Sequence, residues 1–149
     1  MTTRDEWLAL SARAEAATGA DDELDAEVAR LALAPAGSKI ERSPINGALC
    51  IYEPTTYGRE PFRLWDRWPA DFRRNHAFTA STDAMHALIG ETLPGWGYEA
   101  DSGFEGHFWT LREDNGFGAR SGTGRGATPA LAMVSAYCKA RASLGEEGS

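Results

Sequence analysis

The second half of the chain alternates between helix and strand patterns in an order that restricts its fold more than any other feature. Ser81 can cap a helix, with Asp83 near the positive end of the helix dipole, and Pro94-Gly95 ends that helix. Thr128-Pro129 opens a second helix, with threonine as cap and proline at the first helical position. Between the two helices lie three short stretches with turn dipeptides between them, at 96–100, 106–112 and 117–121. These stretches predict an antiparallel β-meander.

The first third of the chain predicts two further helices. The segment from Thr3 to Glu6 has the capping-box pattern, and Gly19 can end the helix that follows it. Asp21 or Asp22 can cap a second helix, which ends before Pro35. Each helix carries only a narrow apolar stripe, so both must pack against the rest of the protein.

Together these patterns predict an α+β fold. It consists of a mainly antiparallel β-meander packed between helices, an α/β/α-type sandwich, with an N-terminal helical pair. We divide the chain into an N-terminal helical segment at 1–34, an irregular insertion with a short strand near 48–52 at 35–77, an α-βββ-α core at 78–144 and a frayed tail at 145–149. A chain of 149 residues suits one domain overall.

Composition restricts the partners. The formal net charge of -7 repels phosphate groups, so direct nucleic-acid binding and membrane binding are not expected. An acidic surface commonly serves only solubility, but it can also dock on a basic partner in place of nucleic acid. No apolar run is long enough for a membrane span and no leader pattern opens the chain, which predicts a cytoplasmic protein. Cys50 and Cys138 lack metal-ligand spacing and are expected to be reduced and buried.

The glycine-rich segment 120–128 is the first candidate site. It is predicted as a loop that runs from a strand into the start of the last helix, where free backbone amides and two arginines could hold a phosphate or a nucleotide. It lacks the lysine of a Walker loop and the spacing of a dinucleotide fingerprint. The alternative is an ordinary connection that ends in a helix cap. The candidate anion-binding residues are Arg120, Gly124, Arg125, Gly126 and Thr128.

The second candidate is the stretch from Tyr57 to Phe78, which is rich in arginine and aromatic residues. These residue types are enriched at the centres of protein interfaces. The alternatives are that the aromatic side chains cover the core while the arginines are solvated, or that the stretch covers a homodimer contact. The candidate partner-binding residues are Trp65, Arg67, Trp68, Arg73 and Arg74.

Catalytic and metal-binding patterns are weak. His76, His86 and His107 lie on separate predicted elements without a close cysteine or histidine neighbour. Asp101 and Glu105 flank a predicted turn, where carboxylates usually serve solubility. We therefore expect no catalytic residues, no metal and no cofactor, and a protein that is not an enzyme.

Four segments of the sequence together resemble a known family: Phe78 to Ala84, Pro94-Gly95-Trp96, the predicted strand through Trp109, and Gly126 to Ala132. They are similar to the phage ABA-sandwich domain, found in small proteins of bacteriophages and prophages. Residues 13–25 are similar to the segment that often precedes that domain. The resemblance implies an antiparallel sheet between helical layers, and the family supplies no established catalytic residues. This chain departs from the family in the long arginine- and aromatic-rich stretch before Phe78.

The expected function follows from the resemblance and the charge. We expect a non-catalytic, phage-encoded accessory protein that binds a host or phage protein. One such protein would be an inhibitor of a bacterial defence system, similar to an anti-CRISPR protein. The alternative is a small-molecule or nucleotide-binding protein that sequesters a signal at 120–128.

Overall fold

The computed structural model describes residues 3–34, 36–42, 49–52, 77–103, 106–113 and 120–148. Four helices and five strands are assigned in these ranges. In chain order they are α1 (Thr3–Ala16), α2 (Asp22–Leu33), β1 (Lys39–Arg42), β2 (Leu49–Tyr52), α4 (Thr82–Thr92), β3 (Gly97–Gly103), β4 (Gly106–Arg112), β5 (Ser121–Gly126) and α5 (Pro129–Gly148).

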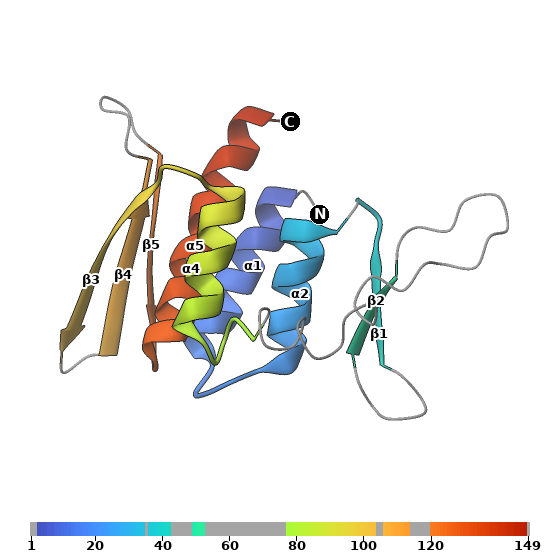
Figure 1. The fold of residues 1–149 in the computed structure, drawn as a ribbon, viewed down its shortest axis with the longest axis horizontal. Helices are drawn as coiled ribbons and strands as arrows, with labels where there is room; N and C mark the ends of the chain where they lie inside the picture. The colour runs from blue at the N-terminus through green and yellow to red at the C-terminus, as the bar shows by residue number, and fades with distance from the viewer. Residues whose placement is uncertain are drawn as a thin grey trace, which may run out of the picture.

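The strands form two separate antiparallel sheets. The larger is the predicted meander, in the order β3-β4-β5, and the smaller is a two-stranded sheet of β1 and β2. Figure 1 shows the layers in sequence: the meander, then α4 and α5, then α1 and α2, and finally the β1-β2 sheet on the far side. The α+β class, the antiparallel meander and the N-terminal helical pair are therefore confirmed.

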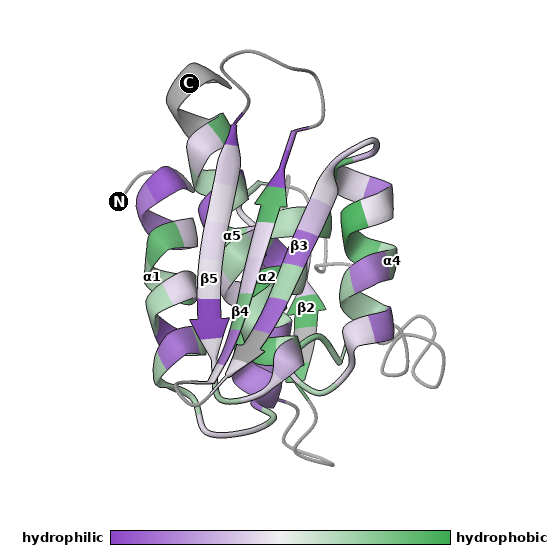
Figure 2. Cartoon of the chain, turned by 90° about the vertical axis from the view of Figure 1, so that its left-hand side faces the viewer, coloured by the Kyte–Doolittle hydropathy of each residue, from purple (hydrophilic) through white to green (hydrophobic). Residues whose placement is uncertain are grey.

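The order of the layers differs from the expected sandwich. All four described helices lie on one side of the meander, between the two sheets, and none of them covers its other face (Figures 1 and 2). The last strand also differs, because β5 runs from Ser121 to Gly126 through the segment predicted as a loop. Strand β1, which pairs with the predicted strand near 48–52, had no sequence signal, and α5 continues beyond residue 144.

Three predicted helix caps are confirmed by hydrogen bonds. The carboxylate of Asp21 accepts from the amides of Glu23 and Leu24, both at 3.1 Å. Ser81 Oγ accepts from the Ala84 amide at 3.1 Å, and Thr128 Oγ1 accepts from the Leu131 amide at 3.2 Å. Each cap satisfies an amide that has no partner inside its own helix, which fixes where α2, α4 and α5 begin.

Strand β5 lies directly on the backbone of α5. Its residues alternate between exposed and buried, and the buried ones are Gly122, Gly124 and Gly126. A Cβ atom on Gly124 would lie 2.2 Å from the Ala136 backbone nitrogen, and one on Gly122 would lie 2.3 Å from the Ala136 carbonyl oxygen. No side chain fits in that space, so glycine at these positions permits a closer approach of helix and strand than packed side chains would allow.

Helix α5 also contacts α1 and α4 through a buried aromatic and polar cluster. The rings of Trp7 and Tyr137 meet edge to face with centroids 5.7 Å apart, and the Arg141 guanidinium lies 5.1 Å from the Trp7 centroid. The Tyr137 hydroxyl lies 2.8 Å from Thr92 Oγ1, so its polar end is satisfied at the end of α4. Cys138, on the same helix, is free and buried as expected.

A polar cluster joins α1 to α5 at another point. One carboxylate oxygen of Glu15 accepts from Ser135 Oγ and from Lys139 Nζ, each at 2.7 Å. Burial raises the pKa of Glu15, but these hydrogen bonds and the charge of Lys139 outweigh that effect and hold the pKa below its usual value. Glu15 therefore stays ionised and helps to hold α1 against α5.

Adding one methyl group to the β5–α5 contact should destabilise the protein strongly. We expect Gly124→Ala to lower the free energy of unfolding by about 3 kcal/mol or more, because the clash is with helix backbone that cannot rotate away. Gly97→Ala, in β3, is the matched control, since its Cβ would meet nothing within 4 Å and should change stability by about 1 kcal/mol at most. Urea unfolding measures both, and equal stability of the two variants would contradict the contact.

Candidate functional site

The two sequence-predicted sites have different outcomes. Trp65, Arg67, Trp68, Arg73 and Arg74 lie outside the described residues, so that site stays a prediction. The residues of the glycine-rich segment are described, and they do not form a loop.

Strand β5 uses most of the predicted anion-binding groups for other contacts. Gly124 and Gly126 face the backbone of α5, and the hydroxyl of Thr128 caps that helix. Arg120 Nε lies 2.6 Å from Glu113 Oε2, and Arg125 Nε lies 3.7 Å from Glu15 Oε1. Because five residues of extended strand span roughly 16 Å, the two arginines lie at opposite ends of β5. The structure therefore corrects the loop prediction and does not bring the two positive charges together.

The face of the meander that points away from the helices is left uncovered by the described helices. We call it the outer face, and Figure 2 views it directly. Burial and register define it, because Trp109 and Leu111 are buried on the helix side while the alternate positions of each strand point away. Its members lie in cross-strand rows: Asp101–Phe108–Arg125, then Glu99–Thr110–Thr123, then Gly97–Arg112–Ser121.

Charge on the outer face changes sign from one edge to the other. Strand β3 supplies Glu99 and Asp101, whereas Arg125 lies on β5. The Arg112 guanidinium bonds the Glu99 carboxylate at 2.7 Å, but both side chains are more than half exposed. Such an exposed pair contributes little to stability. Phe108, half-buried, lies in the middle of the row between Asp101 and Arg125.

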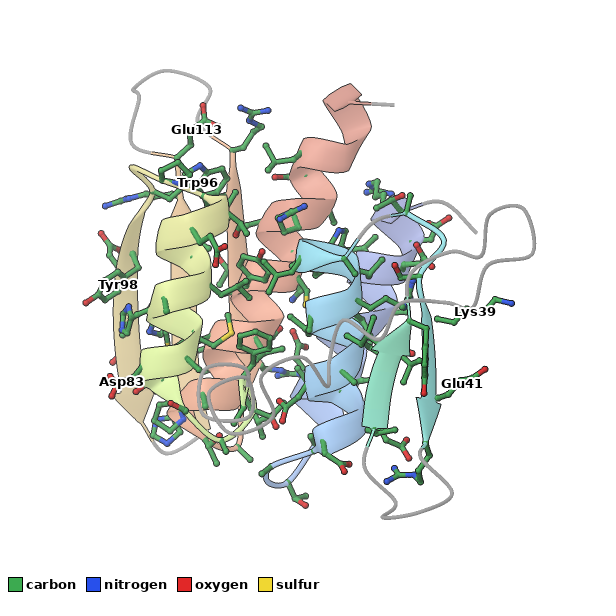
Figure 3. The ribbon with its side chains drawn as sticks, turned by 45° about the vertical axis from the view of Figure 1, so that its right-hand side comes forward. Lys39, Glu41, Asp83, Trp96, Tyr98 and Glu113 are labelled. Atoms are coloured by element: carbon green, nitrogen blue, oxygen red, sulfur yellow. The ribbon has the colours of Figure 1, made fainter. Side chains whose placement is uncertain are left out.

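An aromatic stack lies on the opposite side of β3, where the edge of the sheet approaches α4. The rings of Tyr98 and Trp109 are parallel, with centroids 4.5 Å apart, and His86 of α4 lies 5.2 Å from Tyr98. Trp109 is buried, whereas Tyr98 is 55% exposed. Figure 3 shows Tyr98 at the margin of the molecule, on the side opposite Lys39 and Glu41. The ring of Tyr98 therefore offers a solvent-accessible aromatic face beside the first strand of the meander.

Sequence reasoning missed a buried carboxylate near the start of α2. Asp25 accepts a hydrogen bond from the Thr79 amide at 2.7 Å, and the Asp21 amide donates to Thr79 Oγ1 at 2.8 Å. These bonds connect α2 to the residues that precede α4, beside an open hollow lined by the α1–α2 connection. Burial raises the pKa of Asp25 to about 6, and the negative charges of Asp21 and Asp22 act in the same direction. The hydrogen bonds from Thr79 lower the pKa but do not outweigh these effects.

The arrangement offers little chemistry beyond binding in the described part of the chain. Among the described residues, no three His, Cys, Asp or Glu side chains converge as metal ligands would. Ser135, which bonds the Glu15 carboxylate, is fully buried and cannot reach a substrate. The buried carboxylate of Asp25 has a structural role, because it accepts the hydrogen bond from the Thr79 amide. The outer face and the β3 edge are the best candidate site, and their groups are those of a binding surface.

None of the helices that the structure describes has both the length and the hydropathy required to span a bilayer. No family model, curated protein or solved structure matches this chain. The resemblance to the phage ABA-sandwich domain therefore stays a prediction.

The raised pKa of Asp25 predicts a stability that falls as pH rises. The pKa of Asp25 in the folded protein is about 6, whereas the usual pKa of an aspartate side chain is 3.8. Between these two pH values the folded protein therefore binds more protons than the unfolded protein. Above pH 6 the ionised carboxylate lowers the free energy of unfolding by at most about 3 kcal/mol. We expect Asp25→Asn, which keeps an oxygen for the Thr79 amide, to be more stable than the original chain at about pH 7.5 and equally stable near pH 4.

Urea unfolding across this pH range measures the effect. Asp83→Asn is the matched control, because Asp83 is an exposed aspartate in the first turn of α4 and its replacement should not remove the pH dependence. A larger loss of stability for Asp25→Asn at about pH 7.5 than near pH 4 would contradict the raised pKa.

Proposed function

We propose that this protein is a non-catalytic accessory protein that acts by binding another protein through the outer face of its meander. One observation carries the proposal: no described helix covers this face, although the other face of the same sheet is packed against α5. A half-buried aromatic side chain, Phe108, lies on the middle strand of this face, in the end row between Asp101 and Arg125. Aromatic side chains with polar neighbours are typical of protein-binding surfaces.

The size of the outer face limits how it can bind. Three strands about 4.8 Å apart and about 23 Å long cover roughly 300 Å². A stable interface takes about 800 Å² from each partner. The partner must therefore extend beyond the flat face of the sheet, and the exposed β3 edge with Tyr98 is the nearest additional surface.

The charge of the chain supports a basic partner. The net charge is -7, and the two carboxylates on β3 place negative charge at the open edge of the outer face. The resemblance to a phage domain supports a phage-encoded protein acting on a host or phage protein. A basic nucleic-acid channel of a bacterial defence enzyme, as blocked by anti-CRISPR proteins, is one surface that would suit an acidic inhibitor.

The nucleotide-binding alternative receives no support from the arrangement of 120–128. The glycines of that segment pack against α5, and the arginines lie at opposite ends of the strand with a carboxylate near each. We therefore do not propose it as a second function.

Replacing Phe108 should strongly reduce partner capture without unfolding the protein. We expect the purified protein to retain a basic protein from a bacterial host lysate, and Phe108→Ala to reduce the retained amount about tenfold or more, as for an aromatic side chain that carries much of the binding energy. Leu8→Ala is the matched control, because Leu8 is a partly exposed apolar residue of α1 and should leave capture unchanged. Quantitative mass spectrometry of the retained proteins measures the effect. Capture of no protein, or equal capture by Phe108→Ala, would overturn the proposal.

A further inference from the structure

We infer that the open edge of β3 binds an extended segment of the partner as a fourth strand of the meander, and that this segment alternates basic with apolar side chains. The inference rests on the proposed function, because it names how and with what chemistry the partner would bind. Strand addition supplies affinity through backbone hydrogen bonds and specificity through alternate side chains.

The two edges of the meander are not equivalent. Strand β5 has α1 beside it, and the ion pair of Arg125 with Glu15 joins the strand to that helix. On β3, residues Tyr98 to Asp101 and Gly103 are exposed, and β4 is its only strand neighbour in the described sheet. A β3 strand of seven residues is long enough to pair with a second strand. Within the part of the chain that the structure describes, it therefore presents a row of backbone amides and carbonyls without a strand partner.

The outer side of β3 selects for basic side chains. Glu99 and Asp101 are two residues apart, so both carboxylates point to the outer face. Side chains directly opposite one another on paired strands lie about 5 Å apart, close enough for charge pairs. Asp101 has no hydrogen-bond or ion-pair partner among the described residues, and Glu99 is bonded only by the exposed Arg112. Lysine or arginine on an added strand would meet both carboxylates.

The inner side of β3 selects for apolar side chains. Tyr98 and Ala100 point to this side, and both are exposed although their sheet partners Leu111 and Trp109 are buried. His86 of α4 reaches this side of the sheet and lies 5.2 Å from the Tyr98 ring. An added strand would place its alternate side chains against Tyr98 and the exposed side of α4, which covers apolar surface that is now in water.

A second copy of this chain fits the edge poorly. In a two-fold antiparallel pairing centred on Ala100, Glu99 of each copy would lie opposite Asp101 of the other. Like charges directly opposite on neighbouring strands are destabilising. The charges therefore favour a different, basic strand over a homodimer through β3.

Synthetic peptides of about ten residues test the inference directly. We expect a peptide of alternating lysine and valine to bind and to slow the hydrogen exchange of alternate β3 amides, and a peptide of alternating glutamate and valine to bind at least about tenfold more weakly. Asp101→Lys should weaken binding of the basic peptide about tenfold, and Asp101→Asn about threefold. Glu41→Lys is the matched control for charge, because Glu41 lies on the opposite side of the molecule and should change the affinity less than about twofold (Figure 3).

The outcomes separate this inference from the proposed function. Equal binding of the two peptides, no binding of either, protection of β5 instead of β3, or no effect of Asp101→Lys in a folded variant would each overturn strand addition. If strand addition fails while lysate capture still depends on Phe108, the proposed binding face stands without it. If capture also fails, the proposed function falls with it.

Discussion

The contact between β5 and α5 determines the layout of the rest of the molecule. Because Gly122, Gly124 and Gly126 have no side chains, the strand lies on the helix backbone, and the buried side of the meander is fixed by that contact. Trp109 and Leu111, opposite Gly124 and Gly122, then point into the same core. The alternate residues of all three strands must point to the outer face, and of these the long Arg125 side chain reaches Glu15 of α1.

The same contact makes the two edges of the sheet different. It holds β5 against α5 and beside α1, and it leaves β3 as the strand farthest from that anchor, where the Tyr98 ring contacts His86 and Trp109. The firmly packed strand and the most accessible strand are thus the two edge strands of one sheet. Such an arrangement suits a binding protein, because an exposed surface on a firmly packed sheet loses little conformational freedom when a partner binds.

Sequence patterns within a few residues predicted much of the fold, whereas contacts between residues far apart in the sequence were not predicted. The caps at Asp21, Ser81 and Thr128 involve residues two or three positions apart, so the sequence displays them directly. The buried Asp25–Thr79 bond joins residues 54 positions apart and has no such signal. Glycine favours loops on its own, and only the approach of α5 explains why 121–126 is a strand. Helical periodicity shows which side of a helix is buried, but not on which side of the sheet the helix lies.

Residue-resolved native-state hydrogen exchange of the free protein at low concentration tests the difference between the two edges of the meander most directly. We expect the β5 amides that are bonded to β4, and the amides in the middle of α5, to exchange only through global unfolding. The alternate amides of β3, those facing its open edge, should exchange orders of magnitude faster than the β3 amides bonded to β4. Uniformly slow exchange along β3 would show that its edge is already covered and would contradict the assignment of that edge as a binding site. Fast exchange throughout β5 would contradict the contact on which the fold depends.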